Sequence, residues 1–148
     1  MLVPDDAQDP RSFKLASVED YEPLIGGEAV DRGLVPFDEG TLTGKLTKDS
    51  KWPENDWRSS YFVPENLISS VEHADALKPL VPEGMTMAEM ALRFILNNQA
   101  ISTTIPGMRK LHHVEQNLTA SDAGPLPADL HQKLKRHRWD REPTDWSQ

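Results

Sequence analysis

The chain of 148 residues contains no cysteine. A disulfide framework, a thiolate metal site and a cysteine nucleophile are therefore excluded. The sequence also lacks any apolar run near the roughly 18 residues that a membrane-spanning helix needs. Asp5 and Asp6 stand near the start, where a secretory leader would place basic and then apolar residues. These absences predict a cytoplasmic protein with no membrane partner.

Positive charge is also scarce, since 16 Lys and Arg stand against 24 Asp and Glu. The net charge of −8 and the pI near 5.0 favour solubility and disfavour binding to nucleic acid or to anionic lipid. Hydrophobic residues make up only 37%, and twelve prolines indicate many loops. The apolar residues nevertheless gather in periodic segments, which is typical of a globular domain rather than of a disordered chain.

The first 32 residues show little pattern, and the rest of the chain shows more. The polar, proline-containing start predicts a partly flexible lead-in over residues 1–32. Within it, a short helix is expected from Ser17, ending before Gly26. We expect a domain over residues 33–148, with a C-terminal tail at its end.

Two strands and four helices are predicted in that domain. The apolar run 33–37 and the β-branched run 100–106 indicate strands, and the polar, aromatic stretch 47–64 indicates a long loop. The helices are expected over residues 65–78, 86–98, 110–119 and 127–139. This alternation predicts an α/β fold whose two strands pair in parallel.

Helical spacing assigns an apolar face to each of the four helices. Thr86 and Glu89 form a capping-box pattern at the start of the second helix. The side chains expected on these faces are, helix by helix, Leu67, Ile68, Val71, Ala74 and Leu77; Met90, Ala91, Phe94 and Ile95; Leu111, Val114 and Leu118; and Leu130 and Leu134.

The segment with the most chemical information is residues 102–118, STTIPGMRKLHHVEQNL. A strand ends there and a helix begins, and the free N–H groups of a helix start, beside Arg109 and Lys110, suit an anion. Further along, the amides of Gln116 and Asn117 are able to hydrogen-bond the edge of a base. The arrangement fits a nucleotide; a solvated helix start with surface amides is the alternative.

Four segments in series resemble the aldo/keto reductase family. VPFDEGTLTGKLT (35–47) is similar to the family's segment after the seventh barrel strand, and residues 102–118 resemble its eighth-strand signature. TMAEMALRFILNN (86–98) and HRWDR (137–141) resemble family segments as well. The resemblance covers about residues 33–142 and implies the C-terminal portion of a (β/α)8 TIM barrel, incomplete, with strands seven and eight and their helices. A whole barrel typically needs about 250 residues.

The resemblance also implies that NADP is the cofactor. The turn after the seventh strand would hold the diphosphate and the eighth-strand segment the adenosine phosphate, with Arg109 favouring NADP over NAD. The cofactor-binding residues carried over are Val35, Phe37, Glu39, Gly40 and Lys45 in the first segment, and Gly107, Met108, Arg109, His113, Gln116 and Asn117 in the second. The sequence departs from the family pattern at Val35, where serine is common, and at Gln116, where glutamate is common.

The family's catalytic tetrad of Asp, Tyr, Lys and His, borne on the first four strands, has no match in this chain. Tyr21 and Tyr61 are its only tyrosines, and neither fits the proton donor. We therefore predict no catalytic residue here and no carbonyl reduction by this chain alone. Whether the chain is an enzyme is left open by the resemblance.

The spacing of residues suggests two other sites, a zinc site and a catalytic pair of carboxylates. His112 and His113 with Glu115 suggest zinc, but adjacent helical rings point to different faces, so no metal site is predicted. Glu54 and Asp56 lie in a loop where nothing would raise the pKa of either carboxyl by burial, and Asp56 precedes Trp57-Arg58, which indicates loop packing or a cation–π contact.

Two alternatives to an NADP-dependent carbonyl–alcohol oxidoreductase remain open at this point. The first alternative is a non-catalytic half-barrel interaction module that pairs with itself or another chain, because two parallel strands without neighbours expose backbone and apolar surface. The second is a truncated gene product without a function of its own.

Overall fold

A computed structural model describes residues 2–4, 13–15, 32–33, 36–99, 101 and 103–139. The chain divides into two compact units. The first unit consists of Met1–Pro36 and Ala91–Pro125, and the second of Phe37–Met90 and Leu126–Gln148. The predicted helix from Ser17 lies outside the described residues.

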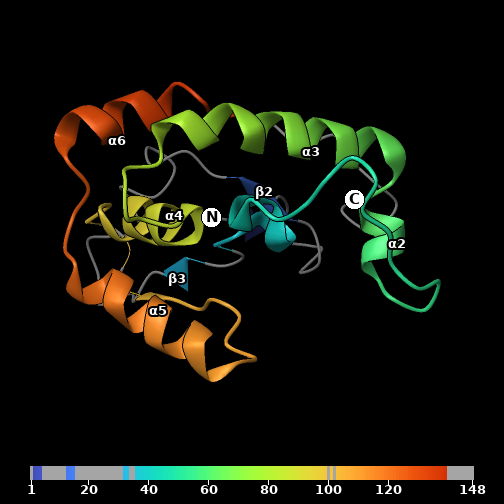
Figure 1. The fold of residues 1–148 in the computed structure, drawn as a ribbon, viewed down its shortest axis with the longest axis horizontal. Coiled ribbons are helices and arrows are strands. Elements are labelled where there is room, and N and C mark those ends of the chain that lie inside the picture. The colour runs from blue at the N-terminus through green and yellow to red at the C-terminus, as the bar shows by residue number, and fades with distance from the viewer. Residues whose placement is uncertain are drawn as a thin grey trace. The chain divides into compact units, whose positions relative to one another are not determined.

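Helices make up most of the described chain, and strands are few and short (Figure 1). The order is β1 (Leu2–Pro4), β2 (Phe13–Leu15), β3 (Arg32–Gly33), the 3-10 helix η2 (Asp38–Thr43), α2 (Arg58–Tyr61), α3 (Pro64–Leu77), the 3-10 helix η3 (Lys78–Leu80), α4 (Met87–Leu96), β4 (Thr103–Thr104), α5 (Leu111–Asp122) and α6 (Ala128–Lys135).

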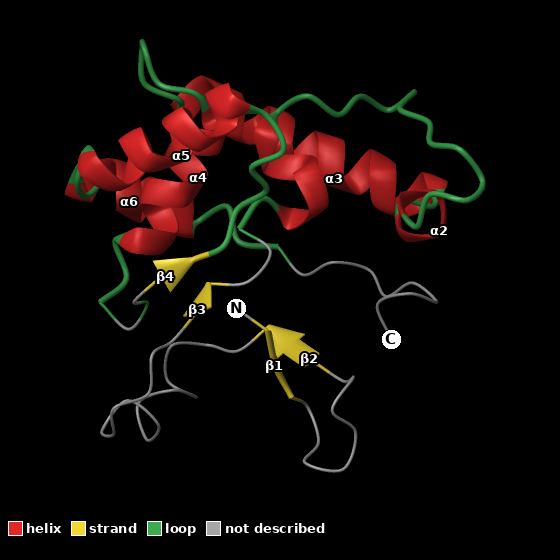
Figure 2. Ribbon diagram, turned by 90° about the horizontal axis from the view of Figure 1, so that it is seen from below, coloured by secondary structure: helices red, strands yellow, loops and turns green. Residues whose placement is uncertain are grey.

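The strands of the first unit form two separate pairs (Figure 2). β1 and β2 pair antiparallel, with Leu2 opposite Leu15. β3 and β4 pair in parallel, with Arg32 opposite Thr103 and Gly33 opposite Thr104. The predicted parallel pairing is therefore present, but both strands are shorter than the runs 33–37 and 100–106 suggest. Pro36 already lies in a turn.

The helix α3 begins at Pro64, whose fixed φ and missing N–H suit a first helical position. Its predicted apolar face is buried except at Ile68, which is 41% exposed. The buried face meets the aromatic loop (residues 47–63). Phe62, together with Tyr61, Leu67 and Val71, forms a hydrophobic cluster of the second unit, with Leu46 and Trp52 packed against it.

The aromatic loop is less open than its polar composition suggests. Tyr61 is only 7% exposed and belongs to the short helix α2, so the prediction of a loop throughout residues 47–64 is wrong at this point. The reason is aromatic packing: Trp52 stacks on Phe62 with ring centroids 5.0 Å apart, and Tyr61 meets Phe62 edge-on.

The capping contact predicted for the second helix is present. Thr86 directly precedes α4, and its hydroxyl accepts a hydrogen bond of 3.0 Å from the N–H of Glu89 in the first turn of the helix. Met90 and Ala91 are buried as expected, whereas Phe94 and Ile95 are only half-buried. α4 crosses from the second unit into the first.

In the first unit, the guanidinium of Arg93 joins α4 to the end of α5. Its Nε donates to the carbonyl of Gly124 at 2.9 Å, and its Nη2 to that of Pro125 at 3.0 Å. The apolar face predicted for α5 is nevertheless only partly covered, since Leu111 is 75% and Leu118 60% exposed, whereas Val114 is half-buried. Periodicity finds such a face but does not supply a neighbour to cover it.

The last helix, α6, buries Leu130 and Leu134, as its pattern predicts. Beyond it, the ring of Trp139 stacks on that of His73 in α3 at 4.7 Å, within the second unit. No helix among the described residues is long and apolar enough to span a membrane.

We predict that Leu67→Ala lowers the free energy of unfolding by about 2–5 kcal/mol, because it leaves a cavity in the cluster around Phe62. Leu111→Ala is the matched control, since this leucine also lies on a helix but is 75% exposed; its effect should stay within about 0.5 kcal/mol. Urea unfolding followed by circular dichroism measures both. Equal effects of the two substitutions would contradict the assignment of the core.

Candidate functional site

The turn after Pro36 has an unusual backbone. Asp38 and Glu39 have φ of 48° and 56°, and Gly40 has φ of 105°. A left-handed conformation costs a residue other than glycine about 1–2 kcal/mol, and such strain is kept where surrounding contacts determine it, commonly at functional sites. Here the carbonyl of Phe37 accepts the N–H groups of Gly40 and Leu42, both at 3.0 Å.

Two further contacts close this turn. The Thr43 hydroxyl donates to the carbonyl of Gly40 at 2.6 Å, and Thr41 is fully buried. Gly44 ends the turn with φ of 70°, and a Cβ there would lie 3.2 Å from the sulfur of Met87. The positive φ therefore favours glycine at 44, and any larger residue there would also have to displace the Met87 side chain slightly.

The structure brings three predicted diphosphate-binding residues into this turn. Phe37, Glu39 and Gly40 are half-buried there, and Lys45 follows at the surface. Val35 lies outside the described residues. The turn belongs to the second unit.

The remaining predicted site residues belong to the first unit, at the start of α5. Gly107, Met108, Arg109 and Lys110 are exposed, and Lys110 precedes the helix in an extended conformation without a side-chain cap. The carbonyl of Lys110 accepts the N–H groups of His113 and Val114. The N–H groups of Leu111 and His112 come before these two and have no acceptor within the helix, so they are the backbone donors that stand beside the two cations, as an anion requires.

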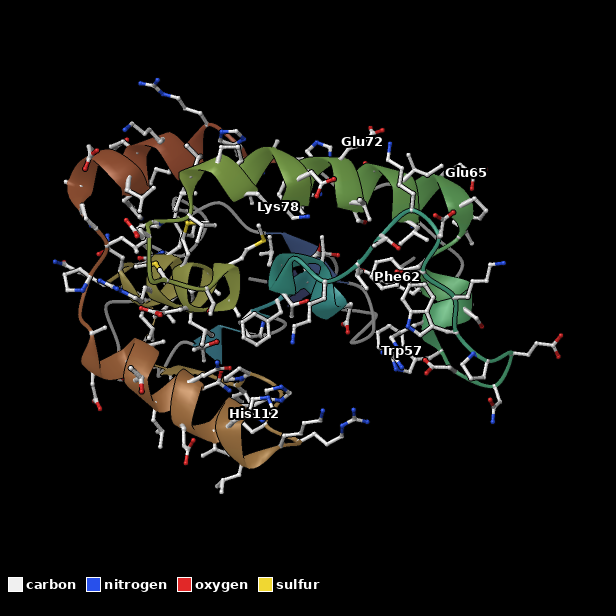
Figure 3. The ribbon with its side chains drawn as sticks, in the orientation of Figure 1. Trp57, Phe62, Glu65, Glu72, Lys78 and His112 are labelled. Carbon is white, nitrogen blue, oxygen red and sulfur yellow. The ribbon has the colours of Figure 1, made fainter. Side chains whose placement is uncertain are left out.

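The two amide side chains of α5 differ in their exposure. Gln116 is exposed, whereas Asn117 is half-buried and its amide nitrogen donates to the carbonyl of Gly107 at 3.4 Å. Asn117 thus ties the helix to the segment before it. His112 lies near the start of α5 (Figure 3), and its ring meets that of His113 edge-on, with the ring centroids 4.3 Å apart. Among the described residues, no three His, Asp or Glu side chains are grouped to hold a metal.

These residues fit the phosphate end of a nucleotide. The helix start carries two exposed cations, Arg109 and Lys110, and no carboxylate lies in the first turn of α5. Beside Gly107, no atom of the described residues lies within 4 Å of the place a Cβ would take, apart from its chain neighbours. A ligand can therefore approach the backbone at this position closely.

The carboxyl of Asp56 is held in a compact contact with Arg58. It accepts hydrogen bonds from the Arg58 N–H at 3.0 Å, from Nε at 2.9 Å and from Nη2 at 2.5 Å. The side-chain hydrogen bond from Arg58 is the main reason that the pKa of Asp56 falls to about 2. The guanidinium lies 5.8 Å from the ring centre of Trp52. A cation–π contact of Arg58 is therefore present, but its partner is Trp52, whereas the sequence suggested loop packing or such a contact at Trp57-Arg58.

This pair lines an open depression of about 550 Å³ with Glu39, Pro53, Asn55 and Trp57. Asp56 and Arg58 were not predicted to pair with each other. The spacing Asp-x-Arg was the available signal, because an aspartate readily accepts the N–H two residues on. An ionised, paired Asp56 cannot act as a proton donor with Glu54 at neutral pH.

We predict that the Asp56 carboxyl titrates near pH 2 in the native chain and moves back toward 3.8 in Arg58→Met. Because the folded pKa lies below the ordinary value, the pair stabilises the fold fully above that value, and the stabilisation is lost as the pH falls through about 2. NMR titration of the carboxyl carbon measures this. An Asp56 that titrates at its ordinary pKa in the native chain would disprove the pairing.

Residues 33–138 match the sequence model of the aldo/keto reductase family. The chain is 29% identical over 98 residues to a probable voltage-gated potassium channel subunit beta of Arabidopsis thaliana, covering 62% of this chain and 29% of that protein. It is 27% identical over 124 residues to an aldo-keto reductase of Pseudocercospora fijiensis, covering 78% of this chain and 39% of that protein.

Solved structures show the same partial match. A glycerol dehydrogenase of Gluconobacter oxydans aligns with a TM-score of 0.64 at 22% identity, covering 74% of this chain and 34% of that one. The holo form of an aldo-keto reductase of Bacillus halodurans aligns with a TM-score of 0.53 at 20% identity, covering 88% of this chain and 41% of that one. The fold thus matches part of the (β/α)8 barrel, and the chain spans 29% to 41% of these relatives. The chain belongs to the aldo/keto reductase family.

Proposed function

We propose that the chain carries the part of an NADP(H) site that binds the cofactor's phosphates and adenosine. The observation that carries this proposal is the uncapped start of α5, where exposed Arg109 and Lys110 flank free backbone donors. Family membership supports it, since aldo/keto reductases are typically NADP(H)-dependent. In barrel terms, we assign β3 and β4 to strands seven and eight.

At the adenosine end, Arg109 binds the 2′-phosphate through charge-assisted hydrogen bonds, with His113 as a second contact. Gly107 and Met108 provide the backbone beside the phosphate, and Gln116 meets the adenine. Asn117, besides any contact with the base, holds Gly107 through its amide.

At the diphosphate end, we assign the turn formed by Phe37, Glu39 and Gly40, with Val35 before it and Lys45 after it. The likeness of residues 35–47 to the family's segment after the seventh strand supports this assignment, together with the tight turn that the positive φ of residues 38 to 40 produces. When bound, NADPH supplies a hydride for reduction of a carbonyl to an alcohol.

No residue of this chain is assigned to proton donation. Tyr61 is buried against Phe62 and Trp57, which supports its exclusion as a general acid. We propose that the chain alone does not reduce carbonyls. We also assign residues 33–148 to the partial barrel with its tail, and residues 1–32 to a lead-in whose last residue, Arg32, begins β3.

NADPH should bind the chain saturably below millimolar concentration, seen as quenching of tryptophan fluorescence. Arg109→Ala should weaken NADPH about tenfold or more but leave NADH nearly unchanged, because only NADPH has the 2′-phosphate. Arg109→Lys should fall between, since it keeps the charge but loses the fork.

Arg136→Ala is the control, because Arg136 is an exposed cation at the end of α6. Absence of saturable NADPH binding by the native chain would overturn the proposed function. Equal losses for Arg109→Ala and Arg136→Ala would overturn the assignment of Arg109 and reduce the effect to net charge.

A second candidate is a half-barrel module that pairs with itself or with another chain. Among the described strands, β3 and β4 pair only with each other, and Leu111 and Leu118 leave the apolar face of α5 exposed. Unpaired strand edges and uncovered apolar surface favour association.

For this candidate, light scattering should give a mass of at least two chains at micromolar concentration. The double variant Leu111→Glu/Leu118→Glu should shift the mass toward one chain while circular dichroism stays the same. A monodisperse native monomer that melts cooperatively would contradict self-pairing.

A further inference from the structure

The guanidinium of Arg93 ties α4 to the turn that follows α5. Arg93 is half-buried, and its Nε donates to the carbonyl of Gly124 at 2.9 Å and its Nη2 to that of Pro125 at 3.0 Å. Both carbonyls come directly after α5, where Gly124 has φ of 73°. Two donors of one planar group therefore hold two successive carbonyls, a geometry that the fork of arginine provides and lysine does not.

Packing alone attaches the C-terminal end of α5 weakly. Among the described residues of this helix only Ala120 is buried, and Leu111 and Leu118 are largely exposed. A depression of about 190 Å³ remains between the end of α4 and the end of α5, lined by Leu96, Ala120, Ser121, Gly124 and Pro125. Side chains therefore do not fill the space beside the Arg93 contact. The two hydrogen bonds of Arg93 are then a main part of what fixes this end of the helix.

The opposite end of α5 carries the residues to which we assign the adenosine phosphate. Asn117, in the second turn of the helix, donates to the carbonyl of Gly107, which attaches α5 to the segment after β4. With twelve residues, α5 is roughly 18 Å long and moves as a stiff rod. A rod with a single attachment can tilt, and a tilt would move its first N–H groups relative to Gly107 and Arg109. The second attachment, at Arg93, removes this freedom.

We propose that Arg93 is a positioning residue of the adenosine-phosphate site: by holding the carbonyls of Gly124 and Pro125, it sets the orientation in which α5 presents its N-terminal donors. The inference rests on the proposed NADP(H) site. A helix whose orientation is already fixed loses less conformational freedom when the phosphate binds, which strengthens binding without a new contact.

Attraction of the phosphate by the charge of Arg93 is a much weaker effect. Its Nε and Nη2 are given to carbonyls, and these carbonyls follow the end of α5 that lies opposite to Arg109 and Lys110. Charges separated by the length of this helix are largely screened at physiological salt, where the Debye length is about 8 Å. Arg93 therefore acts on the position of α5 rather than on the ligand.

Hydrogen exchange of the ligand-free chain tests the attachment without any cofactor. Arg93→Met keeps an apolar stem but removes both donors, so the amides of α5 should exchange roughly threefold faster or more, while those of α3 stay unchanged. Arg93→Lys keeps the charge without the fork and should have a smaller effect. The matched control is Arg136→Met, which replaces an exposed arginine at the end of α6. Unchanged exchange of α5 in Arg93→Met would overturn the proposal.

Binding of adenosine 2′,5′-bisphosphate then tests the consequence for the site, because this ligand carries only the part of NADPH that is assigned to the start of α5. Arg93→Met should weaken the bisphosphate roughly threefold to tenfold, and NADPH by the same factor. Calorimetric titration, under conditions in which circular dichroism shows the variant to be fully folded, measures the dissociation constant and the number of sites. A merely structural role would lower the number of sites and leave the dissociation constant unchanged.

The salt dependence of bisphosphate binding separates positioning from ionic contact. Arg109→Ala removes a charge next to the phosphate, so its affinity should fall less steeply with added salt than that of the native chain. Arg93→Met should bind more weakly but keep the salt dependence of the native chain. A reduced salt dependence in Arg93→Met would show that Arg93 acts through its charge, and the positioning role would be wrong.

The remaining outcomes separate this inference from the proposed function. If the native chain and Arg93→Met bind the bisphosphate equally well, the positioning role is wrong and the proposed function stands. The same holds if NADPH is weakened and the bisphosphate is not, because Arg93 would then act elsewhere than at the start of α5. Failure of the native chain to bind either ligand would overturn the proposed function and this inference with it.

Discussion

The stack of Trp52 on Phe62 is the contact on which the order of the second unit depends. Phe62 belongs to the buried cluster with Leu67 and Val71 of α3, and Trp52 brings the polar part of the aromatic loop onto that cluster. Through the ring of Trp52, the guanidinium of Arg58 is fixed as well. A segment with few aliphatic residues is thereby ordered by four aromatic rings rather than by a regular element, since α2 has only one turn.

The helices were largely predictable, because their signals are local. The proline at 64, the Thr86 cap and the apolar spacing of Leu130 and Leu134 predict α3, α4 and α6 close to where they lie. α2 was not predicted, since a single turn rich in aromatics has no periodicity to detect. The exposed face of α5 marks a different limit, because the pattern of Leu111 and Leu118 reports an apolar face but not its neighbour.

One part of the candidate site was predictable from the sequence and another part was not. The segment before α5 was recognisable because a strand end, a helix start and two cations follow each other in sequence. The strained backbone at Asp38 and Glu39 was not, since neither residue type requires a positive φ. That conformation is set by hydrogen bonds to Phe37 and by the buried Thr41, which only the folded turn reveals. Asn117 was assigned to a base, and its bond to Gly107 gives it a structural contact as well.

The stack of His73 on Trp139 has a consequence for the order in which the chain folds during synthesis. α3 and the aromatic loop are close in sequence and make their contacts soon after they leave the ribosome. Trp139 follows 66 residues after His73, so this ring contact forms only after α4, α5 and α6 have been made. Non-local contacts of this kind form slowly. The His73 side of α3 therefore lacks its contact with Trp139 until the chain beyond α6 has left the ribosome.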